Sequence, residues 1–589
     1  MRLEDLGLIG NCQYSALVDR TGSVVWCCLP RFDSEPLFAA ILDEEDGGRF
    51  VVGSADGTHG EQAYIDNTNV LVTTFNTESG TFRVLDYAPR FAQGETMFHP
   101  KQLHRVIEPV SGHPVVRVRL DARLGWSKER ARQIQGTTHI RLEGYSSPVW
   151  FESNLNLDDV VTGQPFQLTE RKHIALAWGT PIEEPVGELC DRYLLSTIRY
   201  WQRWVKHCNI PPLWQQEVIR SALALKLHCF EDTGAIVAAM TTSIPESPGA
   251  GRTWDYRYCW LRDSYYVLGA LRLLGQFEER EHFLKYLLHV VGDAPDLNLA
   301  PLYRVDGTSD LEERILPSWP GFLGEGPVRV GNGAAQHIQN DIFGEMVLAL
   351  SPLYLDDRFS SERSQSTLEL IARLADRAAS VVGTPDAGIW EYRVAWQPQT
   401  FSSLMCWAAS DRMAMIAARH APDLRGRFEE TAASIRTRII AEAWNEKLGA
   451  FAGTHGGTDL DAALLQMAPL RLLPMHDAKL VATIDAIGNS LSHDGWLFRY
   501  RLDDGFGSPQ VSFMLCTFWM VEALAATGRS VEARRLMEQV RGCMSPLDLM
   551  AEDYAPATGK MWGNFPQAYS HAGLIHGAFA CSPRWLEVA

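Results

Sequence analysis

Two glutamates in loops rich in aromatic residues are the strongest candidates for chemistry in this sequence. Glu391 lies in TPDAGIWEYR, between Trp390 and Tyr392, and Glu552 lies in MAEDYAPATGKMWGNFPQ, just before a turn-rich stretch. Apolar neighbours raise the pKa of a carboxyl group, which a general acid needs near neutral pH. Hydrolysis of a glycosidic bond requires two carboxyl groups on opposite sides of the bond. A glutamate beside aromatic rings is more often a surface residue, so the hypothesis depends on the neighbouring segments.

The segment RTWDYRYCWLRDSYY, residues 252–266, carries more Trp, Tyr, Arg and Asp than the start of a helix requires. Its Arg262 and Asp263 could hold vicinal hydroxyl groups of a sugar, and its aromatic rings supply planes against which a sugar can lie. On this segment alone an alternative is equally good, in which Asp263 caps the following helix and Arg262 pairs with it.

Two further loops carry polar groups whose role the sequence leaves open. In WLFRYRLDDGFGSP, Arg499, Asp503 and Asp504 could contact a sugar, but the two aspartates are better explained as part of a solvated loop. GNGAAQHIQND lacks the preceding strand and the Lys-Ser/Thr ending of a nucleotide-binding loop. We interpret it as a turn before a helix and assign no role to its Gln339 and Asp341.

The charge balance excludes several classes of partner. The formal net charge is −18, whereas a nucleic-acid backbone or an anionic membrane demands a basic face. The N-terminal segment MRLEDLGLIGNCQYSALVDR has no uninterrupted apolar run typical of a signal peptide, and no later stretch is long enough to span a bilayer. We therefore expect a cytoplasmic protein that acts on a small neutral molecule such as a sugar, with association into a homo-oligomer left open.

Cysteine and histidine spacing predicts neither disulfides nor a metal. The 11 cysteines are scattered, with Cys27 and Cys28 as the one adjacent pair, and they form no CxxC pattern. The 17 histidines form no HExxH or other clustered ligand spacing. We expect reduced thiols, no catalytic metal and no cofactor.

The elements that must position these residues change in type along the chain. Up to about residue 185, short β-prone runs such as SVVWCCL and TFRVLDYA alternate with turns, which is typical of an antiparallel β-sandwich. Alternating apolar and charged residues from Val116 to Leu124 indicate a half-buried strand. The run GELCDRYLLSTIRYWQRWVKHC, with Trp201 and Trp204 three apart, then predicts a connecting helix.

Beyond the connecting helix the sequence predicts an all-α domain. Helical segments are expected near 213–231, 260–275, 277–292, 336–355, 362–382, 402–420, 424–446, 458–468, 474–490, 508–527, 529–543 and 567–580. Twelve helices suggest six hairpins in a ring. Long loops rich in aromatic, Gly and Pro residues are expected near 232–259, 293–335, 383–401, 491–507 and 544–566. The expected domains are a β-sandwich at 1–185, a helical linker at 186–212 and a helical catalytic domain at 213–589.

The order of these motifs resembles glycoside hydrolase family 15, which includes glucoamylases, bacterial trehalases and glucodextranases. The resemblance begins at LEDLGLIGNCQYSALVDRTGSVVWCCLPRFDSEPLFAAIL, continues through GAIVAAMTTSIPE and RTWDYRYCWLRDS, and ends with GIWEYR, AEDY and GNFPQAYSH. It covers nearly the whole chain, and its first segment resembles the trehalase-like branch. It implies an N-terminal β-sandwich joined by a helical linker to an (α/α)6 barrel, whose mouth holds the active site.

The resemblance also implies roles for individual residues. Glu391 matches the general acid of the family, and Glu552 matches the general base that activates water. Other matches are residues that would line the terminal-glucose site or stand near the bond to be cut: Tyr258, Trp260, Arg262, Asp263, Trp390 and Arg499. The expected reaction is exo-acting hydrolysis with inversion, which releases β-glucose from a short α-glucoside.

Alternatives remain for the substrate and for the class of protein. Many trehalase-like members of the family carry an acidic residue and a glycine where this chain has GSPQVSFMLCTFW. Glucoamylase-type action on maltose-like or other short α-glucosides is therefore kept level with the alternative, hydrolysis of α,α-trehalose. A catalytically inactive sugar-binding protein would need neither glutamate, and a phosphorolytic enzyme would lack the base carboxylate, so Glu552 argues against both.

Overall fold

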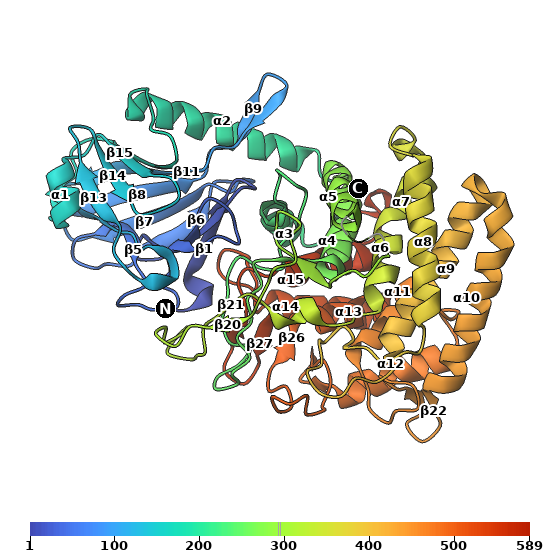
Figure 1. Ribbon diagram of the computed structural model, residues 1–589. Helices are drawn as coiled ribbons and strands as arrows, with labels where there is room; N and C mark the ends of the chain where they lie inside the picture. Colours follow the sequence, from blue (N-terminus) through green and yellow to red (C-terminus); the bar gives the residue numbers. More distant parts are fainter. Residues whose placement is uncertain (293, 295, 589) are drawn as a thin grey trace.

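Two antiparallel sheets in the N-terminal part face each other, and a ring of helices follows them along the chain (Figure 1). This computed structural model describes residues 1–292, 294 and 296–588. Residues 293 and 295, at the start of the expected loop 293–335, and residue 589, at the end of the expected helical domain, lie outside the described residues. The expected combination of an all-β domain and an all-α domain is confirmed.

The first sheet has seven strands, of which β4 pairs with β3 beside the main order. In spatial order they are β1 (Leu6–Gly10), β2 (Ser15–Asp19), β3 (Ser23–Cys28), β5 (Arg49–Ser54), β12 (Val115–Asp121) and β16 (Phe166–Gln167), with β4 at Pro36–Phe38. The strand expected between Val116 and Leu124 is β12, in which buried and exposed residues alternate. It ends at Asp121 because the chain turns at Leu124 into a short 3₁₀ helix.

The second sheet has eight strands. In spatial order they are β13 (Arg132–Gln135), β14 (His139–Glu143), β15 (Val149–Ser153), β17 (Lys172–Trp178), β11 (Gln102–Gly112), β8 (Gly80–Tyr87), β7 (Leu71–Thr77) and β6 (Glu61–Tyr64). Phe50 of β5 meets Phe151 of β15 edge to face between the sheets, with 5.9 Å between ring centroids. The buried Arg105 of β11 pairs with Asp86 at 2.7 Å and donates to the Phe50 carbonyl at 2.8 Å, which ties the two sheets together.

The helix α2 (Val186–Lys206) leads from the sheets to the helical domain and runs along the sandwich (Figure 1). Trp201 is fully buried, and Trp204 packs against the same core. The two indoles meet edge to face at 6.3 Å. Both rings therefore face inward, as their spacing in the sequence predicts.

The helical domain is a double ring. The inner ring contains α4 (Leu261–Leu273), α6 (Asp341–Leu350), α9 (Thr400–His420), a 3₁₀ helix at Ala462–Gln466 continued by α11 (Met467–Leu470), α13 (Met514–Ala526) and α15 (Ala568–Cys581). Each of these contacts the next, and α15 contacts α4, which closes the ring. The outer helices are α3 (Gln215–His228), α5 (Glu278–Gly292), α8 (Gln365–Val381), α10 (Pro422–Ala443), α12 (Ala478–Ser490) and α14 (Ser530–Arg541). Inner helices such as α13 are apolar nearly all round because other elements enclose them.

Three expected helices differ from the structure. The segment at 458–468 is mostly a 3₁₀ helix that Asp461 caps at its start. The helix expected from residue 336 begins only at Asp341, and the helix expected from residue 508 begins at Met514. The two residues before α13 form the short strand β26 (Ser512–Phe513). This strand joins a small sheet with β27 (Asp553–Ala555) and β28 (Lys560–Trp562). Periodicity alone does not separate a short apolar strand from the first turn of a helix.

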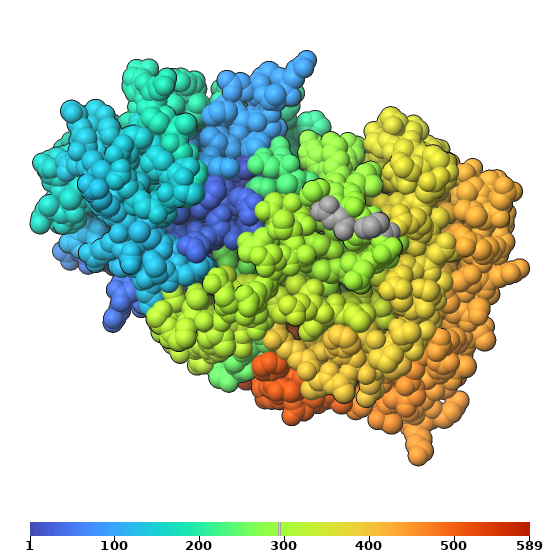
Figure 2. Space-filling model, viewed as in Figure 1, coloured from blue at the N-terminus to red at the C-terminus, as the bar shows by residue number. Residues whose placement is uncertain are grey.

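The sandwich supports the loops of the ring. The indole N–H of Trp26 donates to the carbonyl of Met240 at 2.7 Å. The indole N–H of Trp319 donates to the carbonyl of Trp126 at 3.0 Å, and the space-filling view shows this part of the chain lying against the sandwich (Figure 2). The sheet domain thus contacts loops of the helical ring.

All 11 cysteines are free thiols, and all except Cys208 are buried. In the part of the chain that the structure describes, no helix is both long and apolar enough to cross a bilayer.

Candidate active site

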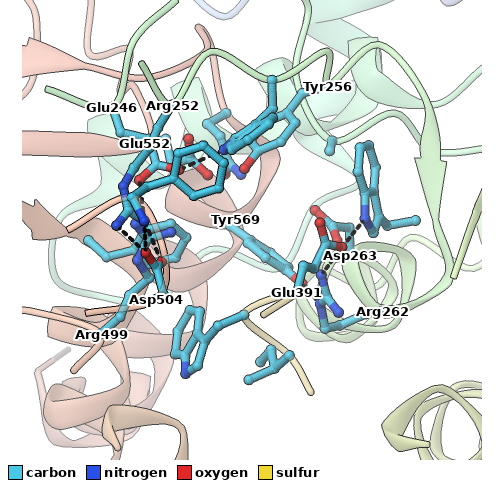
Figure 3. A pocket seen from close by; sticks show the side chains of 18 of the residues that line it. Glu246, Arg252, Tyr256, Arg262, Asp263, Glu391, Arg499, Asp504, Glu552 and Tyr569 are labelled. Atoms are coloured by element: carbon cyan, nitrogen blue, oxygen red, sulfur yellow. Dashed lines mark hydrogen bonds and ion pairs between the residues drawn. The ribbon is translucent and has the colours of Figure 1, made fainter. Parts of the chain in front are cut away.

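A pocket opens where several inner helices of the ring begin (Figure 3). Its charged lining residues are Glu246, Arg252, Arg262, Asp263, Glu391, Arg393, Arg499, Asp504 and Glu552. Its aromatic lining residues are Trp254, Tyr256, Trp260, Trp390, Phe506, Phe513 and Tyr569. The empty space, which includes solvent at the mouth, is about 730 Å³, so the pocket has the size and polarity of a ligand site.

Glu391 is fixed by three donors on one oxygen. Its Oε1 accepts from the indole of Trp260 at 2.7 Å, from Arg262 at 3.2 Å and from the amide of Gln339 at 3.2 Å. Its backbone φ of 59° lies in the left-handed region, which side-chain-bearing residues rarely adopt. The other oxygen makes no hydrogen bond within the described part of the chain.

The electrostatics of Glu391 correct an expectation. Burial acts to raise the pKa of this carboxyl, but Arg262, His337 and the bonds from Trp260 and Gln339 outweigh burial and leave the pKa lowered. The sequence predicted a raised pKa from the aromatic neighbours. It could not show the cation and the amide that folding brings to the same oxygen.

Glu552 lies on the opposite side of the pocket from Glu391 (Figure 3). Burial raises the pKa of Glu552 well above its ordinary value, and the nearby carboxyl of Glu246 adds to the effect, while Arg499 and a hydrogen bond from Tyr256 oppose it. Gly563 has a φ of 77°, and a Cβ there would stand 2.7 Å from the Cβ of Glu552. Only glycine fits this close approach.

Arg262 and Asp263 lie in the first turn of α4. Arg262 is 5% exposed and donates to Tyr569 at 2.9 Å and to Gln339 at 2.6 Å, in addition to Glu391. Its guanidinium therefore orients other side chains of the site. Burial raises the pKa of Asp263 to about 7, although Arg262 and a hydrogen bond from Tyr569 act against this.

Tyr258 does not line the pocket, contrary to expectation, and Tyr256 occupies the wall instead. The hydroxyl of Tyr258 accepts from the backbone N–H of Gly331 at 3.2 Å behind the wall. Tyr256 packs edge to face against Trp260 with 5.3 Å between ring centroids. The two tyrosines are two residues apart in one extended segment, so spacing alone could not decide between them.

Trp260, Trp390 and Arg499 line the pocket as expected. The indole N–H of Trp390 donates to Asp461 at 2.9 Å, which orients the ring beside Glu391. Arg499 forms an ion pair with Glu246 and lies over the ring of Phe513 at 5.1 Å. A buried cation of this kind is tolerated because it is paired and hydrogen-bonded.

Sequence reasoning missed part of the site and left part undecided. Asp504, interpreted as solvated, is buried and lines the pocket, whereas Asp503 is exposed. Asp341 lies behind the wall, 3.7 Å from Arg262. Sequence reasoning also missed pocket residues that lie in motifs quoted above, where the local density of charged and aromatic residues was the available signal; among them are Glu246, Arg252, Trp254, Tyr256 and Tyr569.

No cluster of His, Cys, Asp and Glu among the described residues has the arrangement of a metal site. The pocket instead offers carboxyl groups, guanidinium groups and aromatic planes. These groups suit proton transfer to and from a neutral, hydroxyl-rich ligand.

The chain is similar to several known proteins. The family model described as glycosyl hydrolases family 15 matches residues 214–543, and the one described as trehalase-like, N-terminal, matches residues 1–163. A trehalase of Thermoplasma volcanium is 31% identical, over 97% of this chain and 92% of the relative. A trehalase of Mycolicibacterium smegmatis is 31% identical, over 98% of this chain and 90% of the relative. The solved structure of a bacterial glucoamylase complexed with acarbose has the same fold, with a TM-score of 0.68, 14% identity and coverage of 98% of this chain and 93% of that chain.

Proposed function

Because the chain belongs to glycosyl hydrolase family 15, we propose that it hydrolyses α,α-trehalose with inversion at the attacked carbon. The observation that carries the proposal is the pair Glu391 and Glu552 on opposite sides of one pocket. The sequence placed maltose-like sugars level with trehalose. The two relatives described above are named trehalases and span nearly the whole chain, which supports trehalose as the substrate.

In the proposed reaction, Glu391 gives a proton to the glycosidic oxygen as the bond to it breaks. Glu552 takes a proton from a water molecule that attacks the anomeric carbon from the opposite face. One trehalose and one water yield two glucose molecules, of which the attacked one is the β-anomer. Asp263, at the floor of the pocket, is proposed to hold the terminal glucose and to stabilise the positive charge that develops on its ring.

The hydrogen bonds of Glu391 support its proposed role. Three donors occupy Oε1, so Oε2 is the atom proposed to carry the transferred proton. The surroundings lower the pKa of Glu391 and raise that of Glu552. A bound glucose displaces water from Glu391, and such burial raises the pKa of a carboxyl group. The pair reacts with one proton in total, whichever carboxyl holds it at rest.

The test is glucose release by purified protein from trehalose, maltose, isomaltose, maltotriose and starch. We expect trehalose to be hydrolysed fastest, with an equal mixture of α- and β-glucose in the first minutes, as read by NMR. Faster release from maltose or maltotriose would replace the proposal with glucoamylase-type action. Phosphate-dependent formation of glucose phosphate would replace it with phosphorolysis, and binding without turnover would indicate a sugar-binding protein.

A further inference from the structure

The pocket continues into a side chamber that the proposed reaction does not yet use. The side chamber lies between the segments 246–252 and 506–511, and its empty space, which includes open solvent as in the main pocket, is about 560 Å³. It shares Glu246, Arg252, Arg499 and Phe506 with the main pocket. The two spaces therefore adjoin each other along these side chains.

The side chamber reaches the surface at Phe506, which is 38% exposed and lines both spaces, whereas Asp263 and Gln567 of the main pocket are only 2% and 1% exposed. A pocket that receives a terminal sugar at its floor must hold the rest of the substrate toward its mouth. The side chamber is thus on the side where the leaving sugar has to lie.

The charges around the side chamber are paired. Arg252 donates to both carboxylate oxygens of Asp504, at 2.7 and 2.6 Å, and Arg499 pairs with Glu246. All four side chains are buried. Two cations and two anions in such pairs leave no uncompensated charge for an ionic ligand. Their remaining polar atoms suit the hydroxyl groups of a neutral sugar.

Hydrogen bonds within the segment 503–507 fix its conformation. Oδ1 of Asp503 accepts from the backbone N–H groups of Gly505 and Gly507, at 2.9 and 3.0 Å. Both glycines have positive φ values, 98° and 86°, which L side chains rarely adopt. The segment is therefore a preformed loop rather than a loose one.

Arg252 joins this loop to the opposite wall. In addition to its bonds with Asp504, it donates to the carbonyl of Gly507 at 2.6 Å. The loop thereby brings the ring of Phe506 against Trp254, edge to face at 5.3 Å between centroids. The indole N–H of Trp254 in turn donates to Glu246 at 3.2 Å. The guanidinium of Arg252 thus binds Asp504 directly and also fixes the loop that carries Phe506.

We propose that the Arg252–Asp504 pair determines specificity for the leaving glucose, by holding residues 503–507 so that the side chamber receives this second ring. The inference rests on the proposed function, because it concerns the sugar that leaves. It assigns the pair to binding of the second ring and not to bond cleavage. The pair should therefore matter only for substrates that have a second ring.

The test compares trehalose with α-glucosyl fluoride, which keeps the first glucose and replaces the second with fluoride. We expect Arg252→Gln and Asp504→Asn each to lower kcat/KM for trehalose about 30-fold, mainly through KM, because a charge-assisted pair is lost. For α-glucosyl fluoride the expected loss is below about threefold.

Phe506→Ala, which removes a partly exposed ring, should lower kcat/KM for trehalose about tenfold. Arg501→Gln, which changes an exposed arginine two residues before this loop, is the matched control.

The outcomes separate the inference from the proposed function. Equal losses on both substrates, or no loss on either, would overturn the inference. Wild-type protein that hydrolyses α-glucosyl fluoride but not trehalose would overturn the proposed function. Thermal unfolding of each variant identifies a folding defect, and in that case the Phe506→Ala variant decides the inference.

Discussion

The surroundings shift the pKa of a carboxyl group in opposite directions on the two sides of the pocket. On one side, Trp260, Arg262 and Gln339 all donate to Glu391 and leave its pKa lowered. On the other side, Glu552 lies beside the carboxyl of Glu246, and its pKa is raised well above the ordinary value. Glu552 is buried, and burial is the largest cause of its raised pKa. Glu391 is only partly buried, and although burial acts to raise its pKa, the nearby cation and hydrogen-bond donors outweigh burial.

The proposed reaction needs a proton on Glu391 when the bond breaks, whereas the groups around Glu391 lower its pKa. A sugar ring that excludes water from Glu391 would act in the opposite direction and raise this pKa. Variants on each side of the pocket can therefore test this difference.

The largest expected effect comes from removing each carboxyl group in turn. Glu391→Gln and Glu552→Gln should each lower kcat on trehalose about 10³-fold, because each removes a proton transfer. On α-glucosyl fluoride, whose leaving group needs no proton, Glu391→Gln should stay within about tenfold of wild type, while Glu552→Gln should lose about 10³-fold. Steady-state rates on both substrates measure this split. The reverse pattern would exchange the two roles.

A smaller effect on kcat is expected to distinguish Tyr256 from Tyr258. Tyr256→Phe removes the hydroxyl that donates to Glu552 and should lower kcat about tenfold. Tyr258→Phe should change kcat by less than about twofold, because its hydroxyl bonds to Gly331 behind the wall. Tyr258→Phe should instead lower the melting temperature. A loss of activity in Tyr258→Phe that matched Tyr256→Phe would place both rings against the substrate.

The smallest effect is a shift of the pH profile in Glu246→Gln. The negative charge of Glu246 raises the pKa of Glu552, so a neutral glutamine lets Glu552 lose its proton at lower pH. The pair then becomes fully deprotonated at lower pH, and the alkaline limb of kcat/KM should move to lower pH. Glu313→Gln, which removes a carboxyl paired with Arg393, is the control and should leave that limb in place. An unmoved or upward-shifted limb in Glu246→Gln would contradict the contrast between the two sides.

The sequence predicted the elements that have a clear period. Strand β12 and helix α2 are where alternation and helical spacing placed them. The segment at 458–468 failed because it is short and mostly 3₁₀, for which a 3.6-residue period carries little information. Expected and observed starts of α13 differ because Ser512 and Phe513 pair with a distant strand.

Some of the residues that line the pocket could be predicted from the sequence, but the environment of each could not. Glu391 and Glu552 could be chosen from their motifs, and they do line one pocket. The lowered pKa of Glu391 could not be predicted, because Gln339 reaches it from a loop far away in the sequence. Asp504 was interpreted as solvated because a pair of aspartates in a glycine-rich loop is usually exposed, and its partner Arg252 lies far along the chain.

Closure of the ring has a consequence for protein synthesis. The last inner helix, α15, packs against α3 and α4, which are the first helices of the ring to leave the ribosome. Tyr569 on α15 forms a hydrogen bond with Asp263 on α4, and both side chains line the pocket. The wall of the pocket is therefore complete only after α15 has been synthesised. A nascent chain that stops before α15 lacks both the closing helix and the Tyr569 side chain. We therefore expect chains that end before α15 to lack activity.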